Sequence, residues 1–171
     1  MELSEIAKYA GLCGFPGDHD ENKIAIATAI AMAESKGNPS AHNYNVNSGD
    51  DSYGLWQINM LGPLGPSRRQ QFEINDNSAL LDPCVNAKAM SIVSGEGTNW
   101  QPWTMYTNGE YKKYLESAKK VANVGGSTNE IPIGERVSDI ASNPLGAFNV
   151  LIDPLLKVSQ GILDGFVWIG N

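Results

Sequence analysis

The sequence predicts a mainly α-helical domain of the α+β class, with a small β-hairpin or loop excursion and a helical tail at its C-terminal end. Three patterns lead to this prediction. A nearly all-apolar segment is followed by a polar, turn-rich one, a later helix opens at an Asp-Pro pair, and hydrophobic residues recur every three or four positions near the C-terminal end. The 171 residues suffice for one domain with a core plus an appendage.

The composition indicates a folded, acidic protein. Hydrophobic residues make up 42% of the chain and charged residues 18%, as in globular proteins. The net charge of −7 argues against nucleic acid as a partner, because surfaces that bind nucleic acid are basic. The opening MELSEIAKYA lacks the basic and apolar regions of a signal peptide, and no apolar run is long enough for a transmembrane helix. We therefore expect neither feature.

The first half predicts two helices and a polar excursion. Residues 4–13 fit a short helix. A longer helix is expected to open at Asp18, with Glu21 completing a capping box, and to end near Lys36, since Gly37 suits the position after a helix. Its interior is apolar on every side, which is typical of a buried helix. The polar, turn-forming residues that follow suggest a loop or a small hairpin.

The second half predicts two more helices and a tail. Residues 62–74 are punctuated by Gly and Pro, residues 79–95 fit a helix with Pro83 near its start, and residues 100–126 fit a loop and a last helix. The resulting division is a domain over 1–124, a linker over 125–142 and an amphipathic tail over 143–171. The tail has a heptad-like apolar face, which leaves open whether it packs on the domain or docks onto a partner.

Cysteine and histidine give no sign of a metal site. Cys13 and Cys84 are expected to be reduced thiols in the core, with a single disulfide as the alternative. Two cysteines alone make no metal site, and His19 and His42 lack partners at ligand spacing. We therefore expect no metal and no other cofactor.

Glu34 is the candidate catalytic residue, because it ends the apolar helix. Burial and the negative end of the helix dipole both disfavour the charged carboxylate, so both raise the expected pKa. A carboxylic acid that stays protonated near neutral pH can protonate the leaving oxygen of a glycosidic bond. From the helix alone, a glutamate that simply faces water remains the alternative.

Four motifs in order resemble the lytic transglycosylase and goose-type lysozyme superfamily over roughly residues 5–120. They are Glu34-Ser35 at the helix end, Gly54-Leu55-Trp56-Gln57, the helix start Asp82–Ala87 and the segment Trp103–Gly109. Trp56 departs from the methionine that many members have. The resemblance implies an α+β lysozyme-like fold whose hairpin lines a glycan cleft. More narrowly, the pattern is similar to lysozyme-like domains of bacteriophage virion and tail proteins.

The resemblance implies cleavage of the β-1,4 bond between N-acetylmuramic acid and N-acetylglucosamine in peptidoglycan glycan strands, with Glu34 as general acid and then base. In a lytic transglycosylase one carboxylate suffices. A hydrolytic, inverting lysozyme needs a second one, for which Asp51 or Asp50 is the candidate. The substrate-binding candidates, with core packing as the alternative for the two tryptophans, are Ser35, Ser52, Tyr53, Gly54, Leu55, Trp56, Gln57, Asn86, Trp103 and Tyr106. Ser35 would also orient Glu34.

The same resemblance implies a place of action and partners. We expect the protein in the phage virion, in its tail or interior, or in the host cell envelope on delivery. Residues 143–171 would contact other virion or tail proteins. A function of another class stays open, namely a catalytically inert virion module that only binds glycan.

Overall fold

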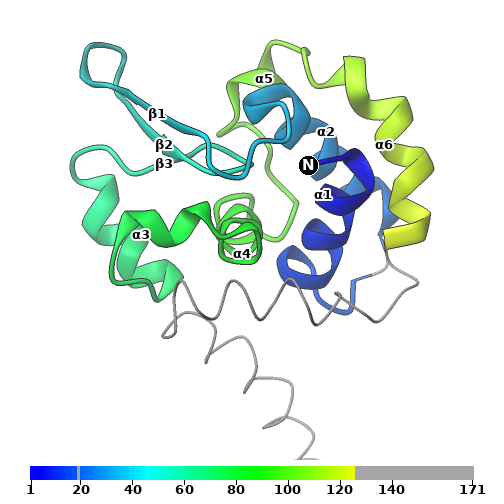
Figure 1. Cartoon of the computed structure of the whole chain (residues 1–171), viewed down its shortest axis with the longest axis horizontal. Coiled ribbons are helices and arrows are strands. Elements are labelled where there is room, and N and C mark those ends of the chain that lie inside the picture. The colour runs from blue at the N-terminus through cyan, green and yellow to red at the C-terminus, as the bar shows by residue number, and fades with distance from the viewer. Residues whose placement is uncertain (19, 126–171) are drawn as a thin grey trace, which may run out of the picture. The chain divides into compact units, whose positions relative to one another are not determined.

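The structure is a computed structural model that describes residues 1–18 and 20–125, and Figure 1 shows the order of its elements. The described part is mostly helical with one small sheet, so the predicted fold class is confirmed. The elements are α1 (Leu3–Tyr9), the π-helix η1 (Ala10–Gly14), α2 (Glu21–Ser35), β1 (His42–Asn45), the 3₁₀ turn η2 (Val46–Ser48), β2 (Asp50–Tyr53), β3 (Ile58–Asn59), α3 (Leu64–Phe72), the 3₁₀ helix η3 (Asn77–Leu81), α4 (Pro83–Val93), α5 (Thr104–Thr107) and α6 (Lys112–Gly125).

The buried helix α2 forms the centre of the core, as predicted. It packs against α1 and α6, and most of its apolar side chains are fully buried. The predicted cap at Asp18 is wrong, because the side chain of Asp20 accepts hydrogen bonds from the first-turn N–H groups of α2, while Asp18 accepts from the Asp20 N–H. The helix ends at Ser35 because Lys36 adopts a left-handed conformation with φ 55°.

The polar excursion after α2 is a three-stranded antiparallel sheet in the order β1-β2-β3. In β1 and β2, His42 lies opposite Tyr53 and Asn45 opposite Asp50. Because side chains alternate along a strand, Asp50 and Ser52 lie on one face of β2, and Asp51 and Tyr53 lie on the other. In Figure 1 this sheet lies apart from α1 and α6, on the opposite side of the described fold.

The Gly- and Pro-punctuated segment 62–74 contains a helix, α3, that the sequence reading missed. Its Gly and Pro residues fall at or before the first turn, where helices tolerate them. At Gly65 a Cβ atom would lie 2.6 Å from the Met60 carbonyl oxygen, so glycine is needed for this close approach. The Arg68 guanidinium donates to the Asn59 carbonyl, which ties α3 to β3.

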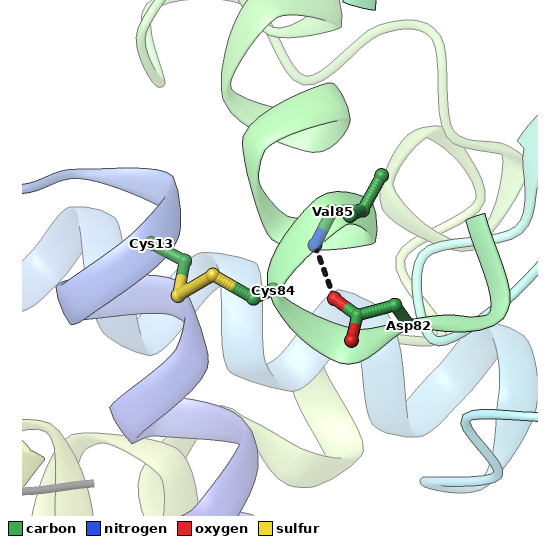
Figure 2. Close-up of a disulfide and its surroundings, with 4 residues drawn as sticks. All are labelled: Cys13, Asp82, Cys84 and Val85. Carbon is green, nitrogen blue, oxygen red and sulfur yellow. Dashed lines mark hydrogen bonds between the residues drawn. A yellow bond between two sulfur atoms is a disulfide. The ribbon is translucent and has the colours of Figure 1, made fainter. Parts of the chain in front are cut away.

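The expectation of reduced cysteines is wrong, because Cys13 and Cys84 form a disulfide (Figure 2). It joins η1 to the first turn of α4, and the two Cα atoms lie 5.3 Å apart. At the same turn Asp82 caps α4 by accepting from the Val85 N–H at 2.8 Å. The two cysteines are separated by 71 positions in sequence and meet because η1 packs against α4.

The predictions for the C-terminal part fall almost wholly outside the described residues. Helix α6 ends at Gly125, the first residue of the predicted linker, so the remainder of that linker and the tail 143–171 stay predictions. Within residues 1–18 and 20–125, no helix has both the length and the apolar character needed to cross a bilayer.

Candidate active site

Glu34 lies in the last turn of α2, where α5 and β2 supply its neighbours. Its Oε1 atom accepts a hydrogen bond from the backbone N–H of Met105 at 3.2 Å. Burial raises the pKa of Glu34, the Met105 N–H opposes this, and the charge of Asp50 raises the pKa further. The side chain is only partly buried, so it keeps access to solvent. The expected upward shift is therefore confirmed in direction, with burial as its main cause.

The two neighbouring aspartates of the hairpin have different surroundings. Asp50 acts on Glu34 through its charge. Its carboxylate accepts from Asn43 Nδ2 at 2.6 Å and from the hydroxyl of Ser52, which is 5% exposed. Asp51 lies on the other face of β2 and pairs with Nε2 of His42 at 2.9 Å. The charge of Asp50 thus contributes to the raised pKa of Glu34, whereas Asp51 is paired with His42.

Tyr53 belongs to the face of the sheet that carries Asp51. The rings of Tyr53 and His42 are stacked with centroids 4.2 Å apart. Burial raises the pKa of Tyr53, an interaction with Asn77 lowers it, and Asp51 raises it. These contacts place Tyr53 with His42 and η3, and they do not bring it to Glu34.

Ser35 does not orient Glu34 through its hydroxyl donor. The Ser35 hydroxyl donates to the carbonyl of Ala31, one turn earlier in α2, at 3.0 Å. The group that holds Glu34 is instead the Met105 N–H. A backbone donor has no signature in the sequence, so the prediction assigned this role to the adjacent serine.

Leu55, Trp56 and Asn86 are fully buried, so their side chains belong to the core, whereas the expected sugar contact through the Leu55 backbone stays a prediction. The Trp56 indole N–H donates to the Ala27 carbonyl at 2.8 Å. Trp103 is 4% exposed, and its indole N–H donates to the Trp56 carbonyl at 2.7 Å. For both tryptophans the alternative of core packing is therefore correct.

Asn86 holds the turn between β2 and β3 in place. Its side-chain oxygen accepts from the Trp56 N–H at 2.9 Å, and its side-chain nitrogen donates to the Tyr53 carbonyl at 2.9 Å. Gly54 lies between them with φ 74°, and a Cβ atom there would lie 2.5 Å from Asn86 Nδ2. Asn86 thus positions the turn of the sheet from α4, and Gly54 leaves room for its side chain.

We expect Asn86→Ala to lower the free energy of unfolding by about 2–4 kcal/mol, because it leaves the buried Trp56 N–H without its acceptor and removes the donor to the partly buried Tyr53 carbonyl. Denaturant unfolding monitored by circular dichroism measures the change. Asn22→Ala, at an exposed position, is the control and should change stability by about 0.5 kcal/mol or less. Equal stability of Asn86→Ala and the control would contradict this role.

Gln57 and Tyr106 remain available for substrate. Gln57 Nε2 donates to the carbonyls of Gly54 and Ala41 at 2.8 and 3.3 Å, so its Oε1 is the atom left to accept from a ligand. Tyr106 follows Met105 directly and stacks on Tyr111 with ring centroids 4.7 Å apart. Both side chains are partly exposed.

The structure adds residues that sequence reasoning missed, namely Met105 and Asn43. Asn43 lies in a run of polar turn formers, where nothing distinguishes it from its neighbours. Among the described residues no group of three or more His, Cys, Asp or Glu side chains is arranged to hold a metal ion. His19 lies outside the described residues.

Comparison with known proteins gives one finding. A family model described as a lysozyme-like domain matches residues 7–105, which is more than half of the chain and contains Glu34, the sheet, α4 and the start of α5. No curated protein and no solved structure matches.

Proposed function

Since the chain belongs to the lysozyme-like domain family, whose members act on peptidoglycan, we propose that it cleaves the β-1,4 bond between N-acetylmuramic acid and N-acetylglucosamine with Glu34 as general acid and base. The observation that carries the proposal is the setting of Glu34. It is a partly buried carboxyl group whose pKa is raised and whose Oε1 is held by a backbone N–H. A module that only binds glycan has no use for such an acid.

In the proposed reaction Glu34 first protonates the bridging oxygen as the glycosidic bond breaks. The Met105 N–H occupies Oε1 and so orients the carboxyl group, and Oε2 is the atom left to deliver the proton. The resulting carboxylate then takes the proton from the C6 hydroxyl of the N-acetylmuramic acid residue whose C1 carried the broken bond. The C6 oxygen attacks this C1 and closes a 1,6-anhydro ring. Gln57 Oε1 and the partly exposed ring of Tyr106 are the proposed sugar contacts.

Hydrolysis is the second candidate function. For this reaction, Asp50 is a better candidate for the base than Asp51. A hydrolase needs a second carboxylate to activate water. The charge of Asp50 contributes to the raised pKa of Glu34, whereas Asp51 is paired with His42 on the other face of the sheet. In this version Asp50 removes a proton from water as that water attacks C1.

The test is digestion of purified peptidoglycan followed by mass spectrometry of the released fragments. Products with anhydro ends identify a lytic transglycosylase, and products with reducing ends identify a hydrolase. If the intact, folded protein binds peptidoglycan but releases no fragments of either kind, both enzymatic functions are wrong and the protein is a glycan-binding module.

We expect activity to persist above pH 4.5, the ordinary pKa of a glutamate, because the acid must be protonated and its pKa is raised in the folded protein. Raising the pH further ionises Glu34, so the rate falls along a basic limb that reports this pKa. Initial rates of glycan cleavage across pH, with folding checked by circular dichroism at each point, measure the limb. A limb at or below pH 4.5 would contradict the assignment.

We further propose that the protein acts outside the reducing cytoplasm, as a virion-associated enzyme or in the host cell envelope on delivery. The disulfide between Cys13 and Cys84 supports this, because disulfides persist in the periplasm and on virion surfaces. Partners among other virion proteins, bound through residues 143–171, remain part of the same proposal.

A further inference from the structure

The chain that follows α5 turns back onto Met105, the residue whose backbone holds Glu34. The Met105 N–H donates to Glu34 Oε1 at 3.2 Å, and the Met105 carbonyl accepts from the Tyr111 N–H at 3.0 Å. Gly109 makes the return possible because it adopts φ 83°, a left-handed conformation that residues with a Cβ atom disfavour. Met105 is thus held by Tyr111 through its carbonyl, while its own N–H holds the acid.

The side chain of Tyr111 gives this return a second contact. Its ring stacks on the ring of Tyr106, the residue next to Met105, with centroids 4.7 Å apart and 28° between the two planes. Aromatic rings in such pairs attract one another beyond the area that they bury. The segment 105–111 is therefore closed twice, by a backbone hydrogen bond and by a pair of rings. A substitution at Tyr111 leaves the backbone donor in place and removes the ring contact.

We propose that Tyr111 is a positioning residue, whose ring holds the segment 105–111 closed and so keeps the Met105 N–H on Glu34. Helix α5 has only four residues, which is too short for a helix to fix its own backbone without support from other contacts. A group that orients a reactive side chain needs such support, because small displacements at an active site are costly. The inference rests on the proposed function, in which Glu34 is the acid, and adds a residue that acts on this acid through Met105.

A change of charge at Tyr111 does not enter into this effect. Burial raises the pKa of Tyr111, and Tyr106 raises it further, so the Tyr111 hydroxyl stays neutral over the pH range in which Glu34 titrates. The charged side chains beside it in sequence, Glu110 and Lys113, form an exposed ion pair with each other. Replacing Tyr111 by an uncharged residue therefore changes contacts and leaves the charges around it as they were.

The direction of a shift in the Glu34 titration separates the two ways in which loss of the ring could act. The Met105 N–H lowers the pKa of Glu34, whereas burial and the charge of Asp50 raise it. Asp50 lies on β2, outside the segment that Tyr111 closes. A weaker hold by the Met105 N–H therefore raises the pKa. Water that merely enters the space left by the ring lowers it, because burial is the largest cause of the present shift.

The test is a carbon-13 NMR titration of the Glu34 carboxyl group in the full chain, assigned by the signal that Glu34→Gln removes. We expect Tyr111→Ala to move the titration midpoint to higher pH, and Tyr111→Phe, which keeps the ring, to restore the wild-type midpoint. The Met105 amide proton should exchange faster with solvent in Tyr111→Ala than in the wild type. Tyr44→Ala, which removes a ring of β1 that is 64% exposed, is the matched control and should change neither quantity.

A variant of the other ring tests the same contact from its second side. Tyr106→Ala should also move the midpoint to higher pH, and it keeps the test valid if Tyr111→Ala fails to fold. Adding Tyr111→Ala to Tyr106→Ala should give little further shift, because the stack is already lost. A midpoint that stays unchanged or moves to lower pH in both single variants would overturn the inference, and so would a Tyr111→Phe protein that behaves like Tyr111→Ala.

The expected consequence for catalysis is a loss of turnover in Tyr111→Ala that Tyr111→Phe avoids. We expect kcat to fall by about 10- to 100-fold, since a displacement of about 1 Å at a catalytic group can cost about 100-fold. A folded Tyr111→Ala protein with the wild-type kcat would overturn the inference as well. Because the titration needs no turnover, its failure is distinct from failure of the enzymatic proposal, which an active Glu34→Gln enzyme would reveal.

Discussion

Glu34→Gln should reduce peptidoglycan cleavage by about 10³-fold or more, since general acid–base groups typically contribute about 10²–10⁴-fold and Glu34 acts in both steps of the proposed reaction. The amide keeps the shape of the side chain, and its oxygen can still accept from the Met105 N–H. It cannot deliver a proton to the bridging oxygen. Initial rates on purified peptidoglycan, with product analysis, measure the loss. Glu116→Gln, at an exposed surface pair with Lys119, is the matched control and should retain full activity.

The same variant should be more stable than the wild type at neutral pH. The pKa of Glu34 is raised in the folded protein, so the wild type carries no penalty at low pH, where Glu34 is protonated in both the folded and the unfolded state. As the pH rises through the raised pKa, the folded protein must ionise a partly buried group and loses stability. The advantage of Glu34→Gln should therefore grow between acidic and neutral pH. Full turnover by a folded Glu34→Gln protein would refute the assignment of the acid.

Removal of the disulfide is the second change with a large expected effect. The bridge closes a loop of 71 positions that contains α2, the whole sheet and α3. The chain-entropy model gives about 4 kcal/mol of stabilisation for a loop of this length. We expect the Cys13→Ala/Cys84→Ala double variant to lose stability by about that amount, measured as a lower midpoint of denaturant unfolding.

Reducing agent provides the internal control for this prediction. Dithiothreitol should destabilise the wild type to about the level of the double variant and should leave the double variant unchanged. A mass difference of two hydrogens between reduced and untreated wild type verifies that the bridge was present. Equal unfolding midpoints for oxidised and reduced wild type would contradict a stabilising bridge.

Much of the fold could be predicted from the sequence, because its signals are local. The apolar run that became α2, the Asp82-Pro83 start of α4 and the polar hairpin each depend on neighbouring residues. The prediction failed where a local signal had two meanings. Asp18 and Asp20 are both plausible caps, and the Gly and Pro residues around α3 mark a helix start as readily as a loop.

The sequence by itself determined that an acid, Glu34, ends a buried helix. Four motifs that occur in the same order as in the lysozyme-like family indicated the family. Only the tertiary structure decided what surrounds that acid. Because β-strands alternate, one step in sequence separates Asp50, which acts on Glu34, from Asp51, which pairs with His42 on the other face. Burial likewise assigned Trp56 and Asn86 to the core, and the packing of η1 on α4 joined Cys13 to Cys84. These outcomes depend on contacts between distant segments, which no local pattern encodes.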